Sequence, residues 1–217
     1  MGGRGASSSI KPKLTQSQMD SVDYYVSGEG MWINNYLRGR EDFGELSSDE
    51  KEYLKDLDTL TSNNKVEQNT LYRTVDVEAI FGSMSYSEYD DLRNELVYNT
   101  FSKAKGQYSQ NMAKMINDRI NRLKGEKITE KGFMSTTKDL SIAENNMYFF
   151  GSQKPIILEI NNVKGKKGYD VLKGSSKKLR EVEARDPQKE VLLGRNQSYT
   201  IQDITTKNGN IYVKVRI

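Results

Sequence analysis

Four short segments of this 217-residue chain carry side chains that could do chemistry. They are residues 23–40 (DYYVSGEGMWINNYLRGR), 71–74 (LYRT), 132–137 (GFMSTT) and 185–201 (RDPQKEVLLGRNQSYTI). They offer polar helix residues, an arginine, a run of hydroxyl residues, and an amide close to a carboxylate. Taken singly, each is also typical of an amphipathic helix, a surface arginine or the polar face of an edge strand. Only their combination and order can therefore indicate a function.

Histidine and cysteine are both missing from the composition. A Ser-His-Asp triad, an imidazole base, a thiolate nucleophile and the usual His or Cys zinc sites are therefore excluded. Any chemistry must use carboxylate, guanidinium, ammonium, hydroxyl or amide groups. The net charge of +3 is too small to argue by itself for nucleic acid or membrane binding.

The elements that position these residues change character along the chain. Helical spacing of apolar residues covers residues 19–37, 47–60, 87–101 and 110–123, and Ser47 and Glu50 have the spacing of a capping box. From about residue 127 short strand-like runs follow, and Asn208-Gly209 predicts a tight hairpin turn between the last two. Helices first and strands later favour an α+β domain with a largely antiparallel sheet.

The segment with Gln188 and Glu190 ends in a strand that enters the core. Because residues i and i+2 of a strand share a face, we expect the amide and the carboxylate to stand side by side before Val191. Residues 164–188 contain few apolar side chains, and we expect a long functional loop there.

The length of 217 residues suits one domain, or one domain with a tail. Residues 1–14 (MGGRGASSSIKPKL) read as a flexible leader, and residues 15–217 as a single catalytic domain. The start has no apolar core of a signal peptide, and no apolar run is long enough to span a bilayer. We therefore expect a cytoplasmic protein, or one delivered into a host cell by separate machinery, without membrane insertion. The opening also resembles those of phage-encoded proteins.

In their order, the arginine, the aromatic-Ser-Thr-Thr strand and Gln-x-Glu resemble the arginine–serine–glutamate class of mono-ADP-ribosyltransferases. The segment INNYLR resembles the N-terminal helix of the bacterial exoenzyme toxins of that class. The resemblance covers about residues 20–217. It implies two packed, mostly antiparallel β-sheets with N-terminal helices, and NAD as the substrate without a metal.

The resemblance also implies a role for each matching residue. Glu190 would stabilise the cationic sugar of the transition state, Ser135 would orient Glu190, and Arg73 would hold the NAD phosphates. Backbone groups of Thr74 would contact the nicotinamide amide. Thr137 takes the place of the family's last serine and keeps its hydroxyl group.

The resemblance also implies further contacts to NAD, from residues that match single family positions. Asn34 and Tyr25 match NAD-contacting positions of the N-terminal helix. Lys154 stands where related toxins place an arginine on the phosphates, and lysine lacks the bidentate fork. Phe149 could stack on the ligand, or could equally be a core residue at a strand end.

The neutral side chain of Gln188 indicates which class of acceptor receives the ADP-ribose. Arginine-modifying relatives have a glutamate at the matching position, and a neutral amide is a poor partner for a guanidinium. We therefore expect a non-arginine acceptor, either an amide side chain of a protein, such as a GTPase, or a nucleobase. The alternatives are an NAD glycohydrolase with the same site, or an inactive binding module. We expect a monomer.

Overall fold

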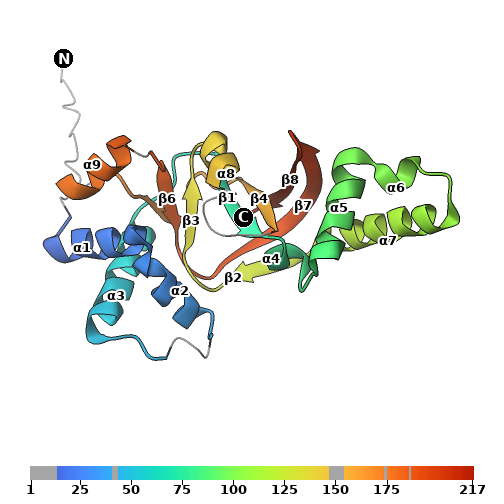
Figure 1. The fold of residues 1–217 in the computed structure, drawn as a ribbon. Coiled ribbons are helices and arrows are strands. Elements are labelled where there is room, and N and C mark those ends of the chain that lie inside the picture. Colours follow the sequence, from blue (N-terminus) through green and yellow to red (C-terminus); the bar gives the residue numbers. More distant parts are fainter. Residues whose placement is uncertain (1–13, 41–43, 147–153, 174, 186) are drawn as a thin grey trace, which may run out of the picture.

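The computed structural model describes residues 14–217 apart from 41–43, 147–153, 174 and 186. Figure 1 shows a central sheet with helices grouped at its two ends. The strands are β1 (Thr70–Asp76), β2 (Lys127–Glu130), β3 (Met134–Thr137), β4 (Pro155–Asn161), β5 (Gly168–Asp170), β6 (Glu190–Leu193), β7 (Gln197–Lys207) and β8 (Asn210–Arg216). The predicted α+β class is confirmed.

The strands hydrogen bond in the order β2-β7-β8-β4-β1-β3-β6-β5, and each pair is antiparallel except β4 with β8. Where we expected two packed sheets, the structure has one continuous strand order. It consists of a larger half, β2-β7-β8-β4-β1, and a smaller half, β3-β6-β5. The register between β1 and β3 consists of the single pair Tyr72–Thr137, whereas β1 pairs with β4 over its whole length. The two halves are therefore joined at one point and are free to diverge beyond it.

The helices divide between these two halves (Figure 1). The N-terminal group packs beside β5 and β6, and comprises α1 (Gln16–Tyr24), the π-helical turn η1 (Tyr25–Glu29), α2 (Gly30–Leu37) and α3 (Ser48–Asn63). The second group covers the larger half and comprises α4 (Glu78–Phe81), α5 (Tyr86–Tyr98), α6 (Thr100–Lys103) and α7 (Gln107–Leu123). Two further helices are α8 (Leu140–Asn146) and α9 (Lys177–Arg185).

Local sequence signals account for many element boundaries. The capping box before α3 is confirmed, since the Ser47 hydroxyl accepts from Glu50 N and the Glu50 carboxylate accepts from Ser47 N. Asn208 and Gly209 both have positive φ, as a type I′ turn requires, and they connect β7 to β8.

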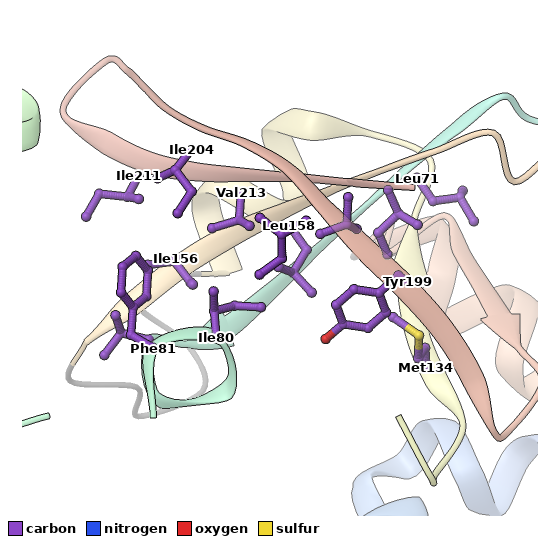
Figure 2. Packing of buried hydrophobic residues seen from close by; sticks show 14 of the residues in the cluster. Leu71, Ile80, Phe81, Met134, Ile156, Leu158, Tyr199, Ile204, Ile211 and Val213 are labelled. Carbon is purple, nitrogen blue, oxygen red and sulfur yellow. The ribbon is translucent and has the colours of Figure 1, made fainter. Parts of the chain in front are cut away.

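Two hydrophobic clusters lie on either side of β6. Val191 and Leu193 belong to the large cluster shown in part in Figure 2, where Leu158 lies beside Val213. Leu192 points to the other side and packs with the N-terminal helices. Because both faces of β6 are buried, Glu190 is the residue at which the strand leaves the core.

The prediction of a long loop over residues 164–188 was wrong, because this stretch contains β5 and α9. Its few apolar residues are enough to attach it to the core: Tyr169, Val171 and Leu179 are buried in the cluster with the N-terminal helices. Along α9 the remaining residues are mostly charged, and Val182 is exposed.

Candidate functional site

Ser135 and Glu190 meet across the antiparallel pair β3–β6. The register sets Thr137 opposite Glu190 and Ser135 opposite Leu192, so Ser135 and Glu190 are diagonal neighbours. The Ser135 hydroxyl donates to Glu190 Oε1 at 2.5 Å. Ser135 is exposed and Glu190 is half-buried, so the hydrogen bond holds the carboxylate at the edge of the core.

The environment of Glu190 disfavours its charged form. Burial raises the pKa of Glu190, and the nearby charge of Glu183 adds to the rise. The hydrogen bond from Ser135 and the positive charge of Arg73 act in the opposite direction. A positive ligand beside this carboxylate would therefore relieve an existing electrostatic penalty.

Arg73 lies in the middle of β1, opposite Leu158 of β4. Its Nη1 atom is buried, and within the described residues it has no hydrogen-bond partner. Buried donors are normally paired, so an unpartnered guanidinium nitrogen is a reason to look for a ligand. A phosphate or carboxylate oxygen fits such a donor.

Thr74 follows Arg73 and lies where β1 and β3 separate. Continuing the Tyr72–Thr137 register would set Thr74 opposite Ser135, but the pairing stops before that point. The Thr74 hydroxyl donates to the carbonyl oxygen of Ala143 in α8 at 2.6 Å. The side chain therefore holds α8 against β1, and only the Thr74 backbone could serve the role expected from the sequence.

Asn34 and Tyr25 are held together inside the N-terminal helices. Asn34 Nδ2 donates to the Tyr25 hydroxyl at 2.8 Å, and Asn34 Oδ1 accepts from Phe133 N at 2.8 Å. A Cβ atom on Gly132 would lie 2.6 Å from Asn34 Oδ1, so this approach requires glycine. Both residues thus attach α2 to the segment entering β3, and their contact with NAD stays a prediction.

Arg38 and Glu130 form an ion pair that the sequence reasoning missed. Arg38 Nε and Nη2 donate to the two Glu130 carboxylate oxygens at 2.9 and 3.0 Å. Although burial opposes it, the hydrogen bonds from Arg38 and from Gly132 N lower the pKa of Glu130, and the charge of Arg73 contributes. Arg38 is four residues after Asn34, hence on the same helix face, and that spacing could have revealed it.

The two remaining residues that the sequence predicts to contact NAD are Lys154 and Phe149. The Lys154 ammonium contacts the Glu78 carboxylate and the carbonyl oxygen of Met84. Its charge is therefore already neutralised beside α4, and its proposed phosphate contact has no support from this arrangement. Phe149 lies outside the described residues.

The expectation that Gln188 and Glu190 share a strand face was wrong in its premise. Strand β6 begins at Glu190, and Lys189 has a φ of 48°, in the left-handed region. Strand alternation therefore does not apply across Gln188-Lys189-Glu190. The Gln188 carbonyl oxygen instead accepts from the Thr137 hydroxyl at 2.8 Å.

Two kinds of feature are absent from the described residues. No cluster of three or more carboxylates within them is arranged to hold a metal ion. Among the helices in the same part of the chain, none combines the length and apolar character needed to cross a membrane.

Comparison with solved structures shows the same fold in bacterial toxins. The C3 exoenzyme of Clostridium limosum is 20% identical, with a TM-score of 0.60 over 94% of this chain and 86% of that one. C3stau2 from S. aureus, solved with NAD, is also 20% identical, with a TM-score of 0.60 over 94% and 87%. BECa of the C. perfringens binary enterotoxin, solved with NADH, is 18% identical, with a TM-score of 0.63 over 94% and 43%.

Among curated protein sequences, none matches this chain. The ADP-ribosyltransferase exoenzyme family, in contrast, matches over residues 3–216, which is nearly the whole chain. The chain therefore belongs to the ADP-ribosyltransferase exoenzyme family and is an NAD-dependent ADP-ribosyltransferase.

Proposed function

We propose that residues 15–217 form one catalytic domain that transfers ADP-ribose from NAD to a non-arginine acceptor. The acceptor is an amide side chain of a protein or a nucleobase. The observation that carries the catalytic part is the 2.5 Å hydrogen bond from Ser135 to Glu190, at the point where β6 leaves the core. The acceptor part rests on the neutral side chain of Gln188, two residues before Glu190.

The bond to be broken joins a ribose to a positively charged nicotinamide. The leaving group departs neutral, so it needs no general acid, and the difficulty lies in the cationic sugar that remains. Glu190 is the carboxylate that faces this developing charge and accepts from the ribose 2′-hydroxyl in our proposal. Burial raises the pKa of Glu190 and so disfavours its ionised form, which the reaction needs. The positive charge of the bound substrate would counteract this effect and favour the ionised carboxylate.

Arg73 is the group that we assign to the NAD phosphates. The support is its buried Nη1, which has no hydrogen-bond partner among the described residues and suits a phosphate oxygen. Thr74 would contact the nicotinamide amide through its backbone. Asn34 and Tyr25 would shape this side of the site by holding α2 against the entry to β3.

Gln188 and α9 would face the acceptor. The amide of Gln188 can both donate and accept, which suits another amide or a base edge better than a guanidinium. The carbonyl oxygen of Gln188 is held by Thr137, so the residue starts from a fixed backbone position. Glu183 occupies the side of α9 toward Lys189, and Val182 is exposed on the same helix.

The test is incubation of the purified protein with labelled NAD and cell lysate, treated afterwards with nuclease or protease. Label that survives one treatment and not the other identifies the acceptor class. Glu190→Gln is the control, expected to lower NAD consumption by ~10²–10³-fold, as removal of a comparable electrostatic group does. Free ADP-ribose without labelled macromolecule would favour an NAD glycohydrolase.

Two further results would overturn parts of the proposal. Efficient labelling of agmatine or of protein arginine by the wild type would refute the non-arginine acceptor. Equal NAD consumption by the wild type and Glu190→Gln would refute the role of Glu190. We expect Gln188→Glu to gain labelling of agmatine, because a carboxylate then faces the acceptor, while NAD cleavage is retained.

A further inference from the structure

Lys189 stands between the two residues that the proposed function assigns to acceptor and NAD. Its φ of 48° is unusual for a residue other than glycine, asparagine or aspartate. This conformation turns the chain at the start of β6, so the direction of Gln188 relative to Glu190 depends on Lys189. A strained backbone at such a place persists only where surrounding contacts hold it.

Three contacts hold Lys189 in this conformation. Lys189 N donates to Glu183 Oε1 of α9 at 2.6 Å. Its Nζ pairs with Asp139 Oδ2 at 2.6 Å, and its carbonyl oxygen accepts from Lys138 N at 3.2 Å. The residue is thus attached to α9 on one side and to the segment after β3 on the other.

Asp139 is itself fixed and charged. Its Oδ1 accepts from Ser141 N at 2.9 Å and from the Ser141 hydroxyl at 2.8 Å, at the start of α8. Its N–H donates to the Thr137 hydroxyl at 3.2 Å, and that hydroxyl donates to the Gln188 carbonyl. The hydrogen bond from Lys189, with those from Ser141, lowers the pKa of Asp139 to about 2, so Asp139 is ionised at any physiological pH.

We propose that Lys189 is a positioning residue that sets Gln188 relative to Glu190 through its left-handed backbone and its ion pair with Asp139. The inference rests on the proposed function, because it assumes that Gln188 serves the acceptor and Glu190 serves NAD. Water needs no placement by Gln188, whereas a macromolecular acceptor does. Loss of the ion pair therefore lowers transfer and leaves NAD hydrolysis nearly unchanged.

The variants distinguish the effect of the Lys189 side chain from the effect of its left-handed backbone conformation. Lys189→Asn removes the ion pair, and asparagine tolerates the left-handed conformation. Asp139→Asn removes the same pair from the other side, and Lys189→Arg retains it. Lys124→Asn is the matched control, because Lys124 and Asp203 form a similarly exposed pair at 2.8 Å on the larger half of the sheet.

The readout is the ratio of transfer to hydrolysis, measured with labelled NAD and the acceptor-containing fraction. We expect Lys189→Asn and Asp139→Asn to lower this ratio roughly fivefold, the effect of a partly exposed ion pair on an equilibrium, and Lys189→Arg to restore it. Lys124→Asn should leave the ratio unchanged. An unchanged ratio in the first two variants, or an equal loss of both activities, would overturn the inference.

Amide hydrogen exchange of the peptide containing residues 183–190 gives a second readout that needs no catalysis. We expect faster exchange of the backbone N–H of residue 189 in Lys189→Asn and Asp139→Asn, and wild-type protection in Lys124→Asn. If the wild type consumed no NAD, the proposed function would fail, and exchange alone would decide the inference. Unchanged protection in both variants would refute the structural role of the ion pair.

Discussion

Ser135→Ala tests how much of the proposed chemistry depends on one hydroxyl. The substitution removes the donor to Glu190 Oε1 and leaves the rest of β3 in place. Ser135 is exposed, so its replacement by alanine creates no buried cavity. The effect on the reaction should therefore exceed what the loss of this hydrogen bond alone does to the stability of the fold.

The size of the effect follows from the kind of hydrogen bond. A hydrogen bond to a charged group stabilises that group by about 1.5–3 kcal/mol, and the half-buried position of Glu190 favours the lower end of this range. Since about 1.4 kcal/mol corresponds to a factor of ten in rate, we expect kcat/KM for NAD cleavage to fall roughly tenfold. The hydrogen bond also lowers the pKa of Glu190, so its loss should move the acidic limb of the pH–rate profile to higher pH.

Thr136→Val is the matched control on the neighbouring residue. The Thr136 hydroxyl points into the protein and donates to the carbonyl oxygen of Val191 at 2.6 Å. Its removal should lower the free energy of unfolding by about 1 kcal/mol, or about 2–4 °C in Tm, with the pH–rate profile unchanged. Thr136→Val should thus lower Tm without a change in the pH–rate profile, whereas Ser135→Ala should change the pH–rate profile.

The assay is release of nicotinamide from NAD between pH 5 and 9, with Tm measured for each protein. The reasoning is refuted if Ser135→Ala keeps the wild-type acidic limb and rate. It is equally refuted if Ser135→Ala loses activity only in proportion to a lowered Tm, because the hydroxyl would then be part of the fold.

Three other variants test the electrostatics and packing of the site. Glu190→Gln should raise Tm at pH 8 by a few degrees, because burial raises the folded-state pKa of Glu190 and its negative charge then costs stability. Below the unfolded-state pKa of about 4.3 the group is protonated in both states and this cost is absent. The gain in Tm should therefore vanish near pH 4. Arg73→Lys keeps the charge without the fork and should weaken NAD binding roughly tenfold by titration calorimetry. Gly132→Ala places a Cβ 2.6 Å from Asn34 Oδ1 and should lower stability by about 1–3 kcal/mol in denaturant unfolding, whereas Gly106→Ala, with nothing within 4 Å, should not.

Much of the fold could be predicted from local patterns. The capping box of Ser47 and Glu50, the Asn208-Gly209 turn and the apolar run after Glu190 are signals carried by a few adjacent residues. Local signals of this kind decide where an element begins and ends, whatever lies around it. The order of helices and strands then restricts the class of fold.

The contacts around Gln188 could not be predicted in the same way. Lys189 has no side chain that signals a left-handed backbone, and its conformation depends on Glu183 and Asp139. Helix α9 was mistaken for a loop because one buried residue, Leu179, is enough to attach it. Long-range contacts decide both cases, and neither has a periodic pattern.

Glu190 and Arg73 both lie in surroundings that disfavour them, and their charges have opposite signs. The nicotinamide and the phosphates of the NAD that we expect there also have opposite charges. Glu190 is a carboxylate whose burial disfavours its charge, and it would face the nicotinamide cation. Arg73 has a buried donor with no partner among the described residues, and it would face the phosphates. Each group is therefore unfavourable in the empty protein for a reason that NAD removes. Because the register between β1 and β3 consists of the single pair Tyr72–Thr137, the two strands can separate beyond it, and we expect NAD to bind there between the two groups.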